Sequence, residues 1–268
     1  MKRIYMIGIA SLVILGLMLI VVLIPKGKRT KIEKDFRKTP ALKEASDALL
    51  EGRILEAKDL YGKAMDGTQD PNSLKKIQEK IEEINIRIIF SPLLDFCSTK
   101  YEVKPQDALE KIAKKFNTTV NLIRRANNLT SDIIRAGQEL KVSTCVFSIV
   151  VDKSQNLLFL KRNGEVVKTY VVSTGKDNST PIGTFKIVNK LENPTLYKAG
   201  AVIPPDSPDN ILGSRWLGFD LKGYGVHGTT EQNNLGEQVT LGCVRMKNQE
   251  VEELFDIVPL GTEVIIID

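Results

Sequence analysis

The C-terminal part of the chain alternates between short β-branched runs and turn signals, and this pattern constrains the fold more than any other feature. The clearest runs are residues 147–152, 157–161, 166–172 and 261–267. Asn163-Gly164 between two of them is typical of a two-residue hairpin turn. Only 248–258 has a helical pattern. Many short strands with one helix predict a mainly β domain over 146–268, either a β-sandwich or a barrel-like sheet.

The other end of the chain carries 21 consecutive uncharged residues, at 4–24. A helix of that length spans a hydrocarbon core of about 30 Å. A cleaved signal peptide is the alternative, but the run exceeds the usual apolar stretch of about 7–15 residues and no small-residue cleavage site follows it. We therefore expect one transmembrane helix at 4–24, after a short basic segment at 1–3 and before a basic juxtamembrane linker at 25–38.

Charge is concentrated near that segment. The formal net charge is +5, and residues 1–40 hold nine Lys/Arg and two Asp/Glu, a net +7, so residues 41–268 sum to −2. This near-neutral remainder argues against a nucleic-acid partner. Five basic residues follow the apolar run and two precede it, which by the positive-inside rule favours a cytoplasmic location for the bulk of the chain. Long domains can translocate regardless of charge. We therefore predict the side of the membrane from the chemistry of the domains described below.

Residues 39–92 have the pattern of helices. Thr39-Pro40 is a typical helix start, and apolar residues recur at helical spacing from Leu74 to Ile88. The spacing of small residues is weakly similar to a tetratricopeptide hairpin. We favour an α-helical spacer that holds the following domains away from the membrane over a peptide-binding repeat.

Residues 99–143 predict a small α+β module with the order strand, helix, helix, strand, in which Asp107 and Glu110 form a capping-box pattern at the first helix. The segment resembles a LysM module. The matching residues are Tyr101, Val103, Asp107, Leu109, Ile112, Ala113, Phe116, Leu122, Asn127, Leu129, Gly137, Gln138 and Leu140. Gln106 stands where the family usually has glycine. The resemblance implies binding of N-acetylglucosamine-containing glycans such as peptidoglycan, and a spacer without a ligand is the alternative.

Cys97 and Cys145 flank this module. If its first and last strands pair antiparallel, the two cysteines lie side by side. A disulfide there would close a loop of about 49 residues and contribute about 4 kcal/mol in the chain-entropy model. It would also require an oxidising compartment. Two buried, unpaired thiols are the alternative.

The chain has a single histidine, His227, and sixteen residues later comes Cys243. Nucleophilic catalysis by cysteine needs a thiolate, an imidazole that takes its proton and a third group that orients the imidazole. Gly242 allows close approach of a substrate carbonyl, and backbone N–H groups around Cys243 suit a developing oxyanion. Taken alone, such a pair is more often a buried thiol and a solvated imidazole. One histidine without an acidic cluster predicts neither a metal site nor a cofactor.

Further motifs surround these two residues. They are 173–176 (STGK), 180–185 (TPIGTF), 192–194 (ENP), 210–216 (NILGSRW), 225–229 (GVHGT) and 242–246 (GCVRM). With these motifs, residues 147–268 closely resemble the L,D-transpeptidase catalytic domain of the YkuD type.

The resemblance implies the role of each site residue. Cys243 matches the nucleophile, His227 the general base, and the carbonyl of Gly228 the group that orients the imidazole. Arg245 matches an arginine that helps to organise the site beside the nucleophile, and Gly242 completes this catalytic set. We expect four further residues to contact substrate: Thr240, Arg215, Trp216 and Asn248. Leu241 departs from the many members that carry a second histidine there, which removes a polar group near the thiol.

The resemblance also implies the reaction. Cys243 would attack the carbonyl of the third residue of a tetrapeptide stem, release the terminal D-alanine, and pass the acyl group to the side-chain amine of a neighbouring stem. Release to water or to a D-amino acid (L,D-carboxypeptidase or exchange activity) is one alternative, and a non-catalytic wall anchor is another. Cross-linking and release both act on peptidoglycan. Both therefore predict a single-pass protein of the cell membrane, whose glycan-binding and catalytic domains face the wall.

Overall fold

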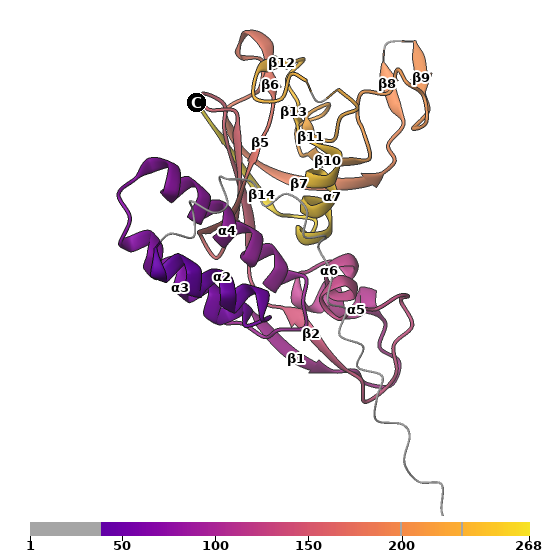
Figure 1. Cartoon of the computed structure of the whole chain (residues 1–268). Helices are drawn as coiled ribbons and strands as arrows, with labels where there is room; N and C mark the ends of the chain where they lie inside the picture. Colours follow the sequence, from indigo (N-terminus) through magenta and orange to yellow (C-terminus); the bar gives the residue numbers. More distant parts are fainter. Residues whose placement is uncertain (1–38, 199, 232) are drawn as a thin grey trace, which may run out of the picture.

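The computed structural model describes residues 39–198, 200–231 and 233–268. The expected segments at 1–3, 4–24 and 25–38 lie outside these residues. Among the described residues, no helix is both long and apolar enough to cross a membrane. Figure 1 shows three parts: a group of helices, a small module beside it, and a larger β domain at the other end of the molecule.

Three helices occupy the predicted spacer. They are α2 (Pro40–Leu50), α3 (Ile54–Asp66) and α4 (Pro71–Ile89). Proline begins both α2 and α4, where its missing N–H costs nothing, and Asp70 accepts a hydrogen bond from the Ser73 N–H at the start of α4. α4 also contacts the β domain, because Asn85 donates to the Val167 carbonyl at 3.0 Å. The spacer therefore packs against the β domain.

The small module has the predicted order of strand, helix, helix and strand. Its elements are β1 (Ser98–Glu102), α5 (Leu109–Phe116), α6 (Val120–Ala126) and β2 (Glu139–Ser143). β1 and β2 pair antiparallel, with Tyr101 opposite Leu140. Both helices bury their apolar faces on this ribbon, around Leu109, Ile112 and Ile123. The module thus has a core of its own.

The capping-box prediction for α5 is wrong. The helix begins at Leu109 after Ala108, which makes no side-chain cap. The Asp107 carboxylate instead accepts hydrogen bonds from the Lys104 N–H and the Tyr101 hydroxyl, both at 2.8 Å. Gln106 has φ +70°, a left-handed conformation that glycine adopts without strain, and this explains the family's glycine at that position.

The β domain is built on one eight-stranded sheet with the order β13-β11-β10-β7-β14-β3-β4-β5. Its strands are β3 (Phe147–Asp152), β4 (Leu157–Arg162), β5 (Glu165–Val171), β7 (Gly183–Glu192), β10 (Arg215–Phe219), β11 (Gly225–His227), β13 (Val244–Arg245) and β14 (Glu263–Ile267). Two short ribbons pair β6 (Thr174–Gly175) with β12 (Gln238–Thr240), and β8 (Leu196–Lys198) with β9 (Ala201–Ile203). The 3-10 helix η1 (Lys176–Asn178) follows β6. The mainly β prediction is confirmed.

Of the two predicted architectures, the sheet follows the barrel-like one. The chain just after β5 returns to the opposite edge, where the Ser173 N–H donates to the Arg245 carbonyl at 2.7 Å and the Arg245 N–H donates back at 2.9 Å. These two bonds join the ends of the curled sheet. The predicted helix is α7 (Asn248–Ile257), which packs Val251, Leu254 and Phe255 into the main core. The predicted hairpin turn at Asn163-Gly164 is also present, with φ of +50° and +88°.

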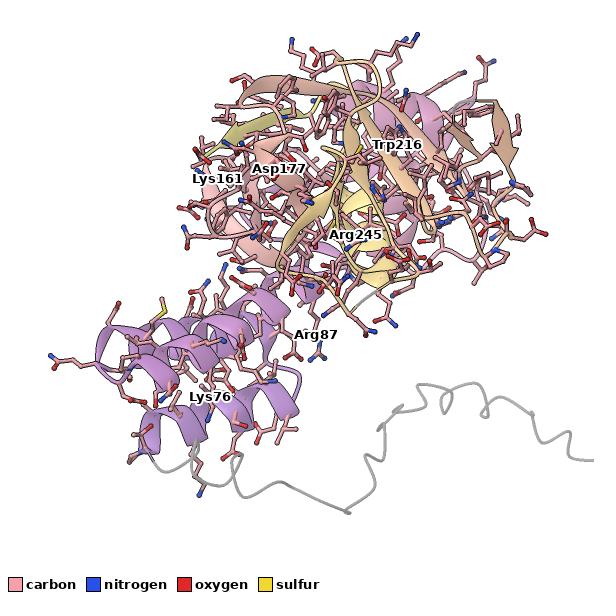
Figure 2. The ribbon with its side chains drawn as sticks, turned by 90° about the horizontal axis from the view of Figure 1, so that it is seen from above. Lys76, Arg87, Lys161, Asp177, Trp216 and Arg245 are labelled. Carbon is pink, nitrogen blue, oxygen red and sulfur yellow. A yellow bond between two sulfur atoms is a disulfide. The ribbon has the colours of Figure 1, made fainter. Side chains whose placement is uncertain are left out.

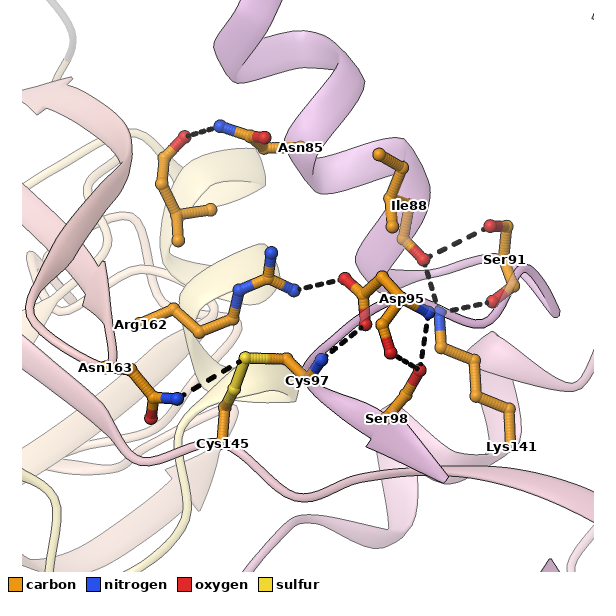
Figure 3. A network of polar contacts seen from close by, with 11 residues as sticks. Asn85, Ile88, Ser91, Asp95, Cys97, Ser98, Lys141, Cys145, Arg162 and Asn163 are labelled. Carbon is orange, nitrogen blue, oxygen red and sulfur yellow. Dashed lines mark hydrogen bonds and ion pairs between the residues drawn. A yellow bond between two sulfur atoms is a disulfide. The ribbon is translucent and has the colours of Figure 1, made fainter. Parts of the chain in front are cut away.

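A polar junction holds the three parts together (Figure 3). The structure joins Cys97 to Cys145 by a disulfide, with the two Cα atoms 5.1 Å apart. Beside it, Arg162 of β4 makes a buried ion pair with Asp95 at 2.7 Å. Lys141 of β2 donates to the Ile88 carbonyl at 2.6 Å, at the end of α4. Spacer, module and β domain therefore meet in one network.

The disulfide makes a prediction about thiol content. Protein purified from an oxidising compartment and denatured without reductant should show one titratable thiol, and Cys243→Ala should show none. The double variant Cys97→Ser/Cys145→Ser should lower the free energy of unfolding by about 4 kcal/mol, since the unfolded chain regains its loop entropy. Chemical denaturation measures that loss. Three titratable thiols in the oxidised protein would contradict the bridge.

Candidate active site

Strand register brings three of the expected residues into one row. Trp216 of β10 lies opposite His227 of β11, and His227 lies opposite Arg245 of β13. Register partners point to the same face of a sheet, so these three side chains share a face. The indole and imidazole rings stack with centroids 6.0 Å apart. Figure 2 shows Trp216 and Arg245 in the β domain, apart from Lys76 and Arg87, which both belong to α4.

Cys243 comes directly before β13 and two residues before Arg245. Continuing the alternation of β13 back by one residue would put its side chain on the face of this row. Its thiol is 3.4 Å from the Gly223 carbonyl, just before β11. Burial raises the pKa of the Cys243 thiol, and a hydrogen bond from the backbone at Gly225 partly offsets this effect. The ground state is therefore a thiol.

His227 is almost completely buried, with 4% of its surface exposed. Burial lowers the pKa of His227 to about 4, with the nearby Arg245 charge acting in the same direction and the hydrogen bond to the Gly228 carbonyl opposing it. At neutral pH the ring is therefore neutral. Its Nδ1 is 2.6 Å from the Gly228 carbonyl, which can only accept, so Nδ1 carries the proton. Nε2 is left with the lone pair that a base requires.

The loop before Cys243 is fixed by two threonines. Thr240 donates its hydroxyl to the Cys243 carbonyl at 2.7 Å and accepts from the Gly242 N–H at 3.1 Å. Thr180 donates to the Gly242 carbonyl at 2.9 Å. Gly242 itself has φ +127°, and a Cβ there would come within 2.7 Å of the Tyr224 ring. Thr240, expected to contact substrate, thus has its hydroxyl engaged in positioning the nucleophile loop.

Asn248 and Arg215 also have partners within the protein. Asn248 begins α7, and its Oδ1 accepts from the N–H groups of Ser214 at 3.0 Å and Thr229 at 3.1 Å. The same oxygen leaves no space for a Cβ on Gly228. Arg215 precedes Trp216 by one residue, so it projects to the other face of the sheet, where its guanidinium is 5.3 Å from the Phe255 ring. The expected substrate contacts of both residues remain predictions.

Arg245 is the cation of the site. Only 8% of its surface is exposed, and one nitrogen lies 3.5 Å from the Glu231 carboxylate. Its Nε and its other terminal nitrogen are buried without a hydrogen-bond partner in the described part of the chain. Unpaired donors of a buried guanidinium are costly, and they suit an oxygen-rich group that binds there.

Sequence reasoning did not single out Thr180, Ser173 or Tyr224. All three contact the backbone around Cys243. Thr180 and Ser173 form hydrogen bonds to the loop and the strand next to it, and Tyr224 packs on Gly242. Thr180 and Ser173 do lie within the motifs that carry the resemblance, so their place there was a usable signal. No group of three or more metal-ligating side chains comes together within the described ranges.

Two family models match the chain. The model of the L,D-transpeptidase catalytic domain, YkuD, matches residues 147–266, and the model of the LysM domain matches residues 101–143.

Relatives named for this activity match as well. "Putative L,D-transpeptidase YqjB" of Bacillus subtilis is 44% identical over 126 residues, which cover 45% of this chain and 70% of that protein. "Putative L,D-transpeptidase YkuD" of Bacillus licheniformis is 36% identical over 174 residues, which cover 62% of this chain and 97% of that protein. Among solved structures, an L,D-transpeptidase from Mycobacterium smegmatis has a TM-score of 0.40 at 21% identity, over 49% of this chain and 64% of that one.

The single imidazole makes a pH prediction that NMR tests without ambiguity. The ring signals of His227 should stay constant from pH 8 to 5.5 and titrate only near pH 4, because burial disfavours the charged ring. Between about pH 6.5, the usual value, and pH 4 the unfolded chain binds a proton that the folded chain does not. This residue's contribution to stability should therefore fall as the pH drops through that window. A titration midpoint near 6.5 would contradict the neutral buried ring.

Proposed function

The chain belongs to the L,D-transpeptidase family, with a YkuD catalytic domain and a LysM module, and on this premise we propose that it cross-links peptidoglycan stem peptides through a thioester on Cys243. One observation carries the proposal. Cys243 directly precedes β13, the strand that pairs with the strand of His227, and the Gly228 carbonyl holds the imidazole with Nε2 unprotonated. A nucleophile, a base and an orienting group are the parts that cysteine acyl transfer needs.

The first half-reaction forms the thioester. His227 Nε2 takes the proton of the Cys243 thiol as sulfur attacks the carbonyl carbon of the third stem residue. The backbone N–H of Cys243 is our candidate donor to the oxyanion, since the Gly242 N–H already donates to Thr240. The imidazolium then gives its proton to the departing amine of D-alanine as the peptide bond breaks.

The second half-reaction reverses these roles. The side-chain amine of a neighbouring stem's third residue attacks the thioester and gives a proton to His227, and a new amide forms. The proton returns to sulfur as the Cys243 thiol leaves. The unpaired nitrogens of Arg245 suit a carboxylate or a carbonyl of the stem peptides, which would hold donor and acceptor in register.

Substitution of the nucleophile and of its base tests this mechanism. Cys243→Ala should abolish thioester formation and transfer, and Cys243→Ser should lose nearly all activity because the hydroxyl pKa is far higher than that of a thiol. His227→Ala should lower the acylation rate about 10²–10⁴-fold. Mass spectrometry with a disaccharide tetrapeptide, with and without an acceptor stem, measures the adduct and the product.

The matched control is Val239→Ala, at an exposed side chain of the neighbouring strand β12, and it should keep full activity. Cross-linking by a folded Cys243→Ala variant would contradict the mechanism. An adduct that only water or a D-amino acid resolves would instead assign L,D-carboxypeptidase or exchange activity.

We propose further that the LysM module and the catalytic domain face the wall, outside the cytoplasm, because a glycan-binding module and a stem-peptide enzyme both need access to peptidoglycan. The disulfide beside Arg162 supports the same side of the membrane, since disulfides persist in oxidising compartments. A reporter fused after Asp268 should be active only outside the cytoplasm. Activity of a cytoplasmic reporter at that position would contradict this location.

A further inference from the structure

The indole of Trp216 lies against two glycines of the sheet. Gly218 follows Trp216 by two residues on β10, and its register partner on β11 is Gly225. A Cβ on Gly218 would come within 2.6 Å of the indole Nε1, and a Cβ on Gly225 would come within 2.9 Å of the six-membered ring. A side chain at either position would displace the ring. The two glycines therefore let the indole lie close to the backbone of both strands.

A hydrogen bond holds the edge of the same ring. Asn189 of β7 is the register partner of Gly218 on its other side, and its Oδ1 accepts the indole N–H at 3.0 Å. An indole has one donor and no acceptor, so this single bond satisfies its hydrogen-bonding capacity. Backbone contact and the bond to Asn189 together fix the plane of the ring, and its faces remain for other contacts.

The neighbour of the indole across the strand pair is the imidazole of His227. The two residues are register partners, their ring centroids are 6.0 Å apart, and their planes differ by 23°. The face of an aromatic ring carries partial negative charge, and a cation within about 6 Å of the centroid is attracted to it. The indole therefore favours the charged form of this imidazole over the neutral form.

The other groups around His227 have different effects on its charge. Burial is the largest effect that lowers the pKa of His227, and the charge of Arg245 acts in the same direction. Glu231 lies 3.5 Å from Arg245 and offsets part of that charge. On α7, which packs against β10 and β11, Glu250 pairs with Lys247 at 3.5 Å. The indole face thus opposes burial and Arg245 directly at the ring.

We propose that the indole of Trp216 stabilises the protonated imidazole of His227 by a cation–π interaction, and that Asn189 is a positioning residue that holds the indole for this contact. The consequence for catalysis rests on the proposed function, in which the proton of the Cys243 thiol moves from sulfur to Nε2 as the carbon–sulfur bond forms. A base whose protonated form is stabilised takes this proton more readily. This role needs no contact between Trp216 and substrate.

Fluorination of the indole tests the contact, because the chain has one tryptophan and one histidine. Growth on tryptophan that carries one or two fluorine atoms on its six-membered ring changes Trp216 alone. Fluorine withdraws charge from the ring face at nearly constant shape. The pKa of His227, measured by NMR of the imidazole, should therefore fall with each fluorine, by about half a unit in total. An unchanged pKa across the series would overturn the cation–π contact.

Substitution of Asn189 tests the positioning role. Asn189→Ala removes the acceptor of the indole N–H and should lower the pKa of His227, whereas Asn189→Asp keeps an acceptor oxygen and should not lower it. Val188→Ala is the matched control, since it changes the adjacent exposed side chain of β7, which projects to the other face. Equal pKa values in Asn189→Ala and Val188→Ala would overturn the role of Asn189.

Acylation kinetics separate this inference from the proposed function. Mass spectrometry follows the adduct of Cys243 with a disaccharide tetrapeptide in the unmodified and the fluorinated proteins. The acylation rate should fall in the same order as the pKa of His227, by about twofold or more across the series. Equal rates despite a lowered pKa would overturn the catalytic role of the indole. Absence of an adduct in the unmodified protein would overturn the proposed function instead, and the pKa series would still decide the contact.

Discussion

Two backbone hydrogen bonds between Ser173 and Arg245 close the curled sheet, and the arrangement of the site depends on them. They hold β13 against the chain after β5, while β13 pairs on its other side with β11. This double pairing sets the register that puts His227 beside Arg245, with Cys243 directly before β13. A slip of one residue would turn these side chains to the opposite face, so the register of the closed sheet decides which residues meet at the site.

Burial affects the pKa of both candidate reacting groups of the site. Burial lowers the pKa of His227 and raises the pKa of Cys243, so burial disfavours the charged form of each group. In the proposed mechanism, proton transfer would therefore accompany attack on the substrate, where the developing charge passes to the carbonyl oxygen. A buried Arg245 with unpaired nitrogens is the natural counterpart to an arriving oxygen-rich group.

The LysM module is attached to the catalytic domain at two separate places. At one place the Asp95–Arg162 ion pair lies beside the Cys97–Cys145 disulfide, where Lys141 also bonds to the spacer at Ile88, and at the other Asp256 contacts α6. The buried ion pair is weak evidence of added stability, because its desolvation offsets much of its attraction, but it fixes orientation. Two attachments resist hinge motion that one linker would allow. The LysM module and the catalytic domain are therefore joined at two places.

Much of this protein follows from local sequence pattern. The hairpin at Asn163-Gly164, the helix that begins at Asn248 and the strand–helix–helix–strand order of the small module are local properties, set by turn chemistry and hydrophobic periodicity. The motifs around His227 and Cys243 indicated the family, and with it the candidate pair.

Only the tertiary structure decided how the other residues act. Asp107 binds Tyr101 rather than capping α5, Thr240 and Asn248 hold loops, and Arg215 packs on the face opposite Trp216. Each of these depends on which distant segments meet and on the face to which a strand turns its side chains, and one-dimensional spacing does not encode either before the sheet curls and closes.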